Sequence, residues 1–155
     1  MTKSVTSLAA VADYPCLVAT DTRWADNDQY GHLNNAVYYQ LFDSAINRWI
    51  AEQTVSTAPP PTFVVAESGC TYYRELSFPS SLLIGFGITR LGRTSVTYDI
   101  VIRDNEHDSG TRMIERHPAA RGRWVHVHVD PHTRRPAEIP NSLRDALQKA
   151  LIQKG

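Results

Sequence analysis

The spacing of hydrophobic and polar positions predicts one long helix in the first half of the chain. Between residues 36 and 52, apolar residues recur at steps of three and four, which is the period of an amphipathic helix. The apolar stripe consists of Tyr38, Leu41, Phe42, Ala45, Ile46 and Trp49. Residues 56–61 end in three consecutive prolines, which cannot continue a helix and make a rigid connection.

Strand patterns dominate the remaining sequence. Residues 16–20 have strand character ahead of the helix, and residues 22–24 are expected to extend that strand. After the helix, apolar runs or period-two alternation predict strands at residues 63–75, 82–91, 96–102 and 124–129. Gly85 and Gly87 indicate a bend or a close backbone approach in the second of these four strands.

These elements together predict the fold class. Strands joined by short turns imply antiparallel pairing, and a long amphipathic helix has to bury its stripe against the resulting sheet. We therefore predict an α+β fold in which a curved antiparallel sheet wraps around one long central helix. Asn141 is expected to cap a short C-terminal helix that runs to residue 151. The length suits one domain over residues 1–155, with a flexible tail at residues 1–13.

Composition and charge limit the classes of partner. Lys plus Arg and Asp plus Glu each number 16, so the net charge is zero with His neutral, and we expect neither nucleic acid nor a membrane as a partner. No apolar stretch approaches the length that spans a bilayer, and the first twelve residues lack the apolar run of a signal peptide. Cys16 and Cys70 fit no metal or redox spacing and are expected to be reduced, which favours a cytoplasmic location.

Residues 26–35 hold the densest group of chemically reactive side chains and read Asp-Asn-Asp-Gln-Tyr-Gly-His-Leu-Asn-Asn. Backbone N–H groups in the first turn of the following helix lack internal partners and favour negative charge, so an oxyanion could be held there. A solvated loop with Asn34 or Asn35 as the helix cap explains much of the same composition. It explains His32 and the neighbouring aromatic residues less well, and composition alone leaves both interpretations open.

The segment at residues 23–38 resembles the D-x-D-x-x-G-H-x-N-N-x-x-Y pattern of hotdog-fold thioesterases. The resemblance is to the 4-hydroxybenzoyl-CoA thioesterase-like group of acyl-CoA thioesterases. Residues 72–79, 90–95 and 134–140 add supporting matches, so that the resemblance covers roughly residues 16–150. The polar segment at residues 105–119 looks longer than usual for the group, and we assign no role to it.

The resemblance implies that Asp28 is the catalytic carboxylate, acting as nucleophile or as general base for water. His32 is the second implied catalytic residue, through an acid–base network. Backbone N–H groups near residues 34–36 would polarise the thioester carbonyl. Asp26 is expected to be structural and to bond loop amides, whereas Asn34 and Asn35 are expected to be helix caps first and substrate contacts second.

Weaker candidates for substrate binding lie elsewhere in the chain. Glu67 could face the catalytic loop from a strand, and Arg93 and Ser95 could meet the pantetheine or phosphates of coenzyme A. Solvated surface positions are the competing interpretation for these residues. His126 and His128 share a strand face, but no third ligand has suitable spacing, so we expect a subunit contact there and no metal site. No cofactor is expected, because coenzyme A is part of the substrate.

Three functions compete. The resemblance favours an acyl-CoA thioesterase, which releases a free carboxylic acid and coenzyme A. A hotdog enoyl-thioester hydratase would have its aspartate and histidine closer together with Asn-Pro between them, whereas Asn34 and Asn35 follow the histidine here. A non-catalytic acyl-thioester binding subunit is the third possibility, and the intact Asp28 argues against it.

We also expect a homo-oligomer, either a dimer or a dimer of dimers. One physical reason is that the sheet leaves its other face and an edge strand uncovered. Another is that Trp124, His126 and His128 put an aromatic ring and two imidazoles on one sheet face, which is more than a monomer usually leaves to water. The resemblance implies that two subunits form a continuous sheet, with the active sites at their boundary.

Overall fold

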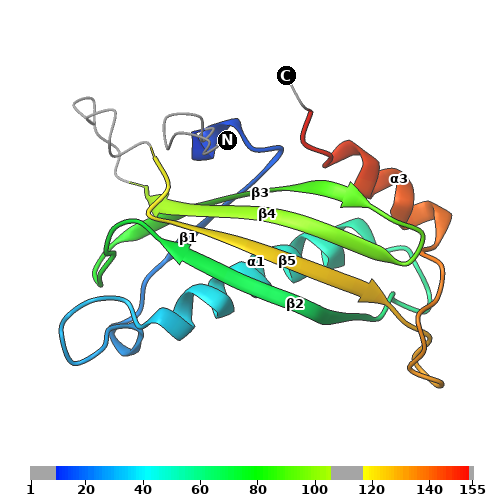
Figure 1. The fold of residues 1–155 in the computed structure, drawn as a ribbon, viewed down its shortest axis with the longest axis horizontal. Coiled ribbons are helices and arrows are strands. Elements are labelled where there is room, and N and C mark those ends of the chain that lie inside the picture. Colours follow the sequence, from blue (N-terminus) through cyan, green and yellow to red (C-terminus); the bar gives the residue numbers. More distant parts are fainter. Residues whose placement is uncertain (1–9, 106–116, 154–155) are drawn as a thin grey trace, which may run out of the picture.

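A five-stranded antiparallel sheet curves around one long helix (Figure 1). The computed structural model describes residues 10–105 and 117–153. In spatial order the sheet consists of β1 (Cys16–Asp21), β3 (Ser81–Leu91), β4 (Ser95–Asp104), β5 (Ala120–His128) and β2 (Phe63–Tyr72). Helix α1 (Asn35–Gln53) lies against one face of the sheet, and the short helix α3 (Asn141–Lys149) follows the last strand. The predicted α+β hotdog architecture is therefore confirmed.

Helix α1 begins at the predicted place because Asn34 caps it. The side-chain oxygen of Asn34 accepts a hydrogen bond from the N–H of Ala36 at 2.9 Å, which satisfies one of the unpaired amides of the first turn. The buried face consists of Val37, Tyr38, Phe42, Ala45, Ile46 and Ile50. At the other end, the Thr54 hydroxyl donates to the carbonyl of Ile50 at 2.8 Å.

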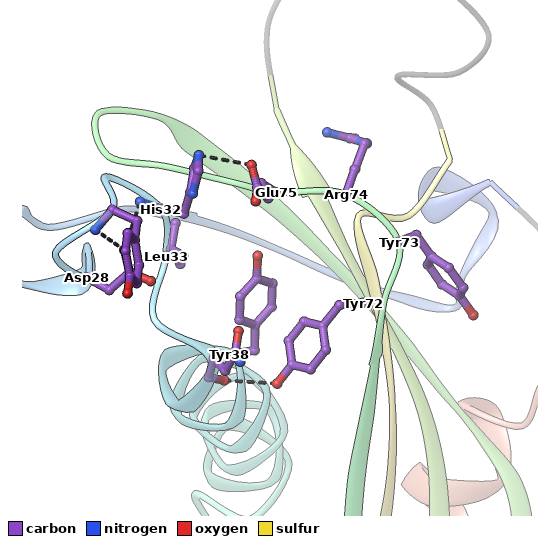
Figure 2. A pocket seen from close by; sticks show the side chains of 10 residues that line it. Asp28, His32, Leu33, Tyr38, Tyr72, Tyr73, Arg74 and Glu75 are labelled. Atoms are coloured by element: carbon purple, nitrogen blue, oxygen red, sulfur yellow. Dashed lines mark hydrogen bonds and ion pairs between the residues drawn. The ribbon is translucent and has the colours of Figure 1, made fainter.

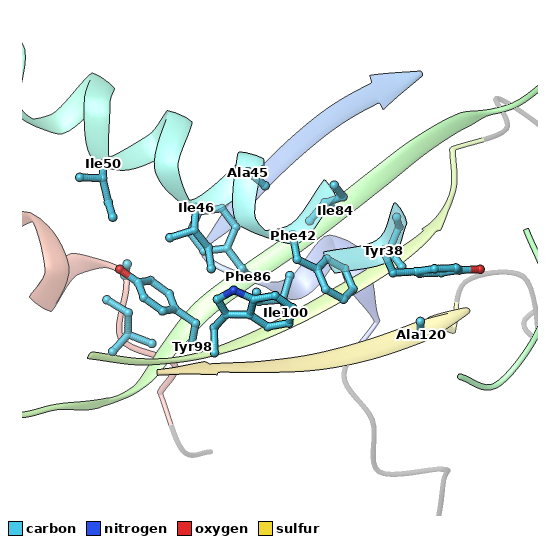
Figure 3. Close-up of a cluster of buried hydrophobic side chains, with 14 of the residues drawn as sticks. Tyr38, Phe42, Ala45, Ile46, Ile50, Ile84, Phe86, Tyr98, Ile100 and Ala120 are labelled. Carbon is cyan, nitrogen blue, oxygen red and sulfur yellow. The ribbon is translucent and has the colours of Figure 1, made fainter. Parts of the chain in front are cut away.

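The core lies between α1 and the inner face of the central strands (Figure 3). Side chains alternate between the two faces of a strand, so alternate residues of β3 and β4 meet the helix. The fully buried ones are Leu82, Ile84, Phe86, Ile88, Val96, Tyr98, Ile100 and Ile102. Burying each such side chain contributes roughly 1.5–3 kcal/mol, and together they hold α1 and its N-terminus in place over the sheet.

Two glycines of β3 allow other parts of the chain to approach the outer face of the sheet. A Cβ at Gly85 would lie 2.6 Å from the carbonyl oxygen of Val11, and one at Gly87 would lie 2.5 Å from Cγ1 of Ile152. The predicted close backbone approach is therefore confirmed. It also corrects the predicted tail: Val11–Asp13 form a 3-10 helix in which Val11 is fully buried, while residues 1–9 lie outside the described residues.

Two local predictions differ from the structure. Residues 24–26 form a short 3-10 helix and do not extend β1, because Asp26 turns back to bind Arg23. Pro140, not Asn141, occupies the N-cap position of α3, and its carbonyl accepts the N–H groups of Leu143 and Arg144. The segment predicted as a polar loop at residues 105–119 lies mostly outside the described residues.

The inner face of β5 was misassigned from the sequence. Trp124 and His126 are 2% and 1% exposed, so neither leaves an open sheet face for a partner. The Trp124 ring meets Phe42 of α1 edge to face at 5.6 Å between centroids, and the His126 ring stacks on Phe63 at 5.6 Å. The expected subunit contact at these two residues is wrong, because α1 of the same chain covers them. Among the described residues, no group of three or more His, Cys, Asp or Glu side chains could hold a metal ion.

Strand β2 is an edge strand with little cover on either face. Among the described residues it pairs only with β5, and residues 64–68 are all exposed. Val65 is 48% exposed, an unusual state for a valine in a ten-residue strand. Within the described part of the chain, no helix is long and apolar enough to cross a bilayer.

Candidate active site

The loop at residues 27–33 is a tight turn that places two reactive side chains close together. Asn27 and Leu33 form an antiparallel bridge at its base, and the N–H of Asp28 donates to the carbonyl of His32 at 2.7 Å. Gly31 lies at a φ of +81°, a left-handed conformation that glycine adopts without steric cost. The glycine thus lets the chain reverse between Asp28 and His32.

The carboxylate of Asp28 is held by backbone amides of its own loop. Its Oδ1 accepts the N–H of Tyr30 at 2.8 Å and the N–H of His32 at 3.3 Å. These two bonds fix the orientation of the carboxylate. Within the described residues, Oδ2 has no hydrogen-bond partner and is available for chemistry.

Asp26, two residues earlier, has a structural role, as predicted. Its carboxylate accepts the backbone N–H of Arg23 at 2.7 Å and two guanidinium N–H groups of Arg23 at 2.8 and 3.1 Å. Burial raises the pKa of this carboxyl, but the hydrogen bonds from Arg23 outweigh burial and hold the pKa below its usual range. The backbone carbonyl of Asp26 accepts the N–H of Asn34 at 2.9 Å, so Asp26 connects the start of the loop to the helix cap.

A second loop, at residues 73–79, lies beside the first and is bonded to it in three places. The N–H of Leu33 donates to the carbonyl of Leu76 at 2.8 Å. The N–H of Phe78 donates to the side-chain oxygen of Asn27 at 2.9 Å. The third contact joins side chains: Nε2 of His32 lies 2.9 Å from Oε2 of Glu75.

The two loops and the start of α1 enclose a pocket of about 600 Å³ (Figure 2). Its lining consists of Asp28, Tyr30, His32, Leu33, Asn35, Tyr38, Tyr72, Tyr73, Arg74 and Glu75. The Tyr72 hydroxyl donates to the carbonyl of Asn35 at 3.1 Å, and the rings of Tyr72 and Tyr38 meet edge to face at 5.0 Å. Burial raises the pKa of both phenols, so both remain neutral hydrogen-bonding groups at ordinary pH.

The structure brings some of the predicted site residues together. Asp28, His32 and Asn35 line the same pocket. Asn34 lies beside it, with its side-chain oxygen committed to the helix cap. Because α1 starts at this pocket, the partial positive charge of its N-terminus lies at the pocket wall.

Glu67 lies elsewhere in this chain. Its carboxylate is bonded to the Arg123 guanidinium, and both residues line a separate pocket of about 440 Å³ with Asp99 and Arg121. Asp99 is part of a network on the outer side of the sheet: it accepts two hydrogen bonds from Arg121, each 2.7 Å long, and one from the Tyr14 hydroxyl at 2.8 Å. Within one chain, Glu67 does not reach Asp28.

Arg93 and Ser95 lie at the opposite end of the sheet. Strand β3 begins beside the Asp28 loop, where the N–H of Thr22 donates to the carbonyl of Ser80 at 3.0 Å. Its eleven residues then span roughly 35 Å at about 3.3 Å per residue before the chain turns at Arg93. There the Arg93 guanidinium lies 4.0 Å from Glu138. These two residues can join an Asp28 site only from another chain.

Sequence reasoning missed Glu75, Tyr72 and Tyr38 as pocket residues. Glu75 and Tyr72 belong to a segment that supports the family resemblance, yet nothing in their local pattern indicates that they face His32 and Asn35. Tyr38 was assigned to the apolar stripe of α1, and it is indeed 2% exposed. A stripe residue in the first turn of α1 can serve the core and line the pocket at once, which periodicity does not reveal.

Several solved structures are similar to this chain. The PA5185 protein from Pseudomonas aeruginosa strain PAO1 is 34% identical, with 92% of this chain and 95% of that chain covered and a TM-score of 0.79. A thioesterase from Thermus thermophilus, solved with coenzyme A and zinc, is 27% identical, with coverage of 87% and 98% and a TM-score of 0.71. A 1,4-dihydroxy-2-naphthoyl-CoA thioesterase from Synechocystis shares the fold at 17% identity, with coverage of 85% and 94% and a TM-score of 0.70.

No curated protein matches this chain. The profile of the Thioesterase-like superfamily, in contrast, matches residues 22–147. This range contains the Asp28 loop, all of α1 and strands β2 to β5. The chain therefore belongs to the Thioesterase-like superfamily, a family of thioester hydrolases with the hotdog fold.

Proposed function

We propose that this protein is an acyl-CoA thioesterase that hydrolyses an acyl-CoA to a free carboxylic acid and coenzyme A. The observation that carries the proposal is the position of Asp28. Its carboxylate is held by two loop amides at the wall of a pocket of about 600 Å³, beside the N-terminus of α1. The coenzyme A present in the Thermus thermophilus thioesterase structure supports this class of substrate.

The chemistry follows from this arrangement. With Asp28 as general base, the carboxylate takes a proton from water, and the water oxygen attacks the thioester carbonyl carbon. The carbonyl oxygen becomes an oxyanion, which backbone N–H groups at the start of α1 stabilise. The carbon–sulfur bond then breaks, and the thiolate of coenzyme A recovers the proton. With Asp28 as nucleophile, its carboxylate attacks the thioester carbonyl carbon, the carbon–sulfur bond breaks to release the thiolate of coenzyme A, and an acyl-carboxylate anhydride is left on Asp28. Water then hydrolyses this anhydride to the free carboxylic acid and restores the Asp28 carboxylate.

His32 is the second proposed catalytic group, because it lines the same pocket and an imidazole can act as a general acid or base. Asn34 and Asn35 place the helix N-terminus against the carbonyl. No metal or other cofactor enters this scheme, because the carboxylate and imidazole supply the proton transfers. We place the enzyme in the cytoplasm, where acyl-CoA substrates and reduced cysteines are expected.

We further propose that two chains form the working unit. The exposed edge of β2 offers unpaired backbone groups along its length, and pairing of two such edges would make one continuous sheet. A neighbouring chain could then bring Arg93 and Ser95 to the coenzyme A moiety. Glu67, which lies on β2 itself, would be at this boundary.

The test is release of free thiol from a panel of acyl-CoAs. We expect turnover by the unaltered protein, and loss of turnover with retained folding in Asp28→Asn, since the amide is nearly isosteric but cannot accept the proton. Asp145→Asn, an exposed carboxylate on α3, is the matched control and should keep full activity. Hydration of an enoyl-CoA without thiol release would indicate a hydratase, and tight acyl-CoA binding without either reaction would indicate a binding subunit.

A further inference from the structure

We propose that Glu75 is a positioning residue for His32, so that the acid–base unit of the site is a carboxylate–imidazole pair built from two loops. The inference rests on the proposed function and extends it to a residue outside the D-x-D-x-x-G-H motif. The geometric basis is the 2.9 Å separation between Nε2 of His32 and Oε2 of Glu75. In Figure 2 the Glu75 carboxylate points at the imidazole edge from the neighbouring loop.

Both backbone positions are fixed, which distinguishes this pair from a chance surface contact. Leu33, next to His32, is 3% exposed, and Leu76, next to Glu75, is 4% exposed. The N–H of Leu33 donates to the carbonyl of Leu76 at 2.8 Å. The His32 and Glu75 side chains therefore project from neighbouring, bonded positions of two anchored loops.

The other neighbour of Glu75 is also anchored. The backbone N–H of Arg74 donates to the carbonyl of Ala119 at 3.1 Å, and its guanidinium lies 2.8 Å from Asp104 at the end of β4. Glu75 thus lies between two residues that the fold holds in place. The backbone at Glu75 is therefore held within reach of the His32 ring.

A contribution to folding stability does not explain the contact between His32 and Glu75. The His32 and Glu75 side chains are 43% and 72% exposed in this chain, and exposed ion pairs contribute only about 0–1 kcal/mol. Orientation is the effect that such a contact can supply. A base that is itself oriented by a third group is the general arrangement of activated catalytic sites.

The chemical consequence concerns the two nitrogens of the imidazole. A carboxylate beside Nε2 keeps the proton on that nitrogen, so Nδ1 is left as the proton acceptor. When Nδ1 takes over the proton that Asp28 has removed from water, the Glu75 carboxylate stabilises the imidazolium. The proton is returned when the thiolate leaves, so Glu75 itself is unchanged. Asp28 is the other carboxylate that lines the pocket, and its Oδ1 accepts the backbone N–H of His32, not a ring N–H.

Steady-state kinetics of matched variants test this role. Glu75→Ala should lower kcat about 10- to 100-fold, less than the full general acid–base contribution of about 100- to 10,000-fold, and should leave KM nearly unchanged. Glu75→Gln should retain more activity, since its amide oxygen can still accept the Nε2 proton. Glu52→Gln, an exposed α1 glutamate paired with Arg48, is the control and should match the unaltered enzyme.

A double variant separates positioning from a general effect on the pocket. In a His32→Ala background, Glu75→Ala should cause no further loss of kcat, because nothing remains to be oriented. An equal loss in both backgrounds would overturn the proposal, as would a Glu75→Ala enzyme with unaltered kcat.

A measurement independent of activity completes the test. Nitrogen-15 chemical shifts of the His32 ring report which nitrogen carries the proton in the neutral form. We expect Nε2 protonation to be nearly complete in the unaltered protein and less complete in Glu75→Ala. Identical shifts would reject the pairing even if no acyl-CoA were hydrolysed. Absence of turnover together with the expected shifts would instead reject the proposed function and leave the pairing intact.

Discussion

Asp26 binds Arg23 through both of its carboxylate oxygens. Oδ2 accepts the backbone N–H of Arg23, and Oδ1 accepts two N–H groups of its guanidinium. The carboxylate is almost fully buried, whereas the Arg23 side chain is 71% exposed. A charged group is therefore buried two residues before Asp28, where it fixes the direction in which the chain enters the loop.

This relationship predicts the effect of Asp26→Asn. The variant loses the charge that the three hydrogen bonds stabilise, so the free energy of unfolding at pH 7 should fall by about 1–3 kcal/mol. Urea denaturation measures the loss, and turnover should fall with it because the Asp28 loop loses its anchor. Asp21→Asn, an exposed carboxylate at the end of β1, should change neither quantity appreciably.

Asp26→Asn should also change how the free energy of unfolding depends on pH. A carboxyl whose folded pKa is held below its usual range stabilises the fold above the unfolded value of about 3.9. That contribution disappears as the pH falls through the lower pKa that Asp26 has in the folded protein. The difference in unfolding free energy between the unaltered protein and Asp26→Asn should therefore shrink as the pH is lowered from 7 toward 3. A constant difference over that range would contradict a charged Asp26.

Gly31 is the residue that the turn between Asp28 and His32 requires. At a φ of +81°, a side chain costs about 1–2 kcal/mol. Although a Cβ would meet no atom within 4 Å, Gly31→Ala should strain the turn and displace Asp28 and His32. We expect a clear drop in kcat with a stability loss of about that size. Gly31→Asn should recover part of both, because asparagine tolerates this conformation; an equally poor Asn variant would argue against a backbone cause.

The sequence predicted α1 correctly but did not predict which face of β5 meets it. Helix α1 and its Asn34 cap were predictable because the period of three to four residues and the cap are local signals. Alternation in β5 also grouped Trp124 with His126 on one face. It could not tell which face meets α1, since that depends on how the sheet curves around the helix.

The role of Glu75 was hidden for a related reason. It lies 43 positions after His32 in the chain and reaches it only because Leu33 and Leu76 pair across the two loops. Similarly, Val11 looked like part of a tail because its partner, the backbone at Gly85, lies far along the sequence. Contacts of this kind carry no periodic signature.

The buried histidine of β5 predicts a second dependence on pH. Burial lowers the pKa of His126 below its usual range, and the nearby Asp43 offsets this only in part. Its Nδ1 has no hydrogen-bond partner among the described residues. The unfolded chain takes up a proton below about pH 6.5 that the folded chain does not, so stability should decrease as the pH falls below that value.

Urea denaturation between pH 5 and pH 8 measures this effect. The slope from His126 can reach about 1.4 kcal/mol per pH unit. His126→Leu should flatten the slope below pH 6.5, because it removes the group that must stay neutral when folded. His132→Leu, at an exposed position after β5, should keep the slope of the unaltered protein. Equal slopes in both variants would show that His126 titrates freely.

Relative rates should distinguish the two proposed catalytic groups. Asp28→Asn removes the group that activates the attack and should abolish thioester hydrolysis. His32→Ala removes a proton-transfer contribution of about 100- to 10,000-fold and should leave measurable turnover. Purified variants with intact circular dichroism, assayed by thiol release, allow the comparison. If His32→Ala costs more than Asp28→Asn, the two roles are reversed.

The last prediction concerns assembly through β2. Strand β2 is an edge strand with exposed Val64 and Val65, and such an edge favours pairing with a second chain. A two-fold interface would use this same patch of both copies. A Val64→Glu/Val65→Glu variant would bring like charges together there. Sedimentation should report a dimer for the unaltered protein and a monomer for this variant, with lower specific activity because Arg93 and Ser95 of a neighbour are lost from the site.

Two control substitutions decide whether β2 is the edge involved. Val55→Glu alters a valine that is 83% exposed beyond the end of α1, so it adds a comparable charge away from β2 and should leave the dimer intact. Leu17→Glu alters the opposite edge strand, β1, where Leu17 is 48% exposed. Dissociation by Leu17→Glu alone would move the interface to β1 and leave the β2 boundary without a role. A fully active monomer at assay concentration would overturn both the assembly and the shared site, because Asp28 would then need nothing from a second chain.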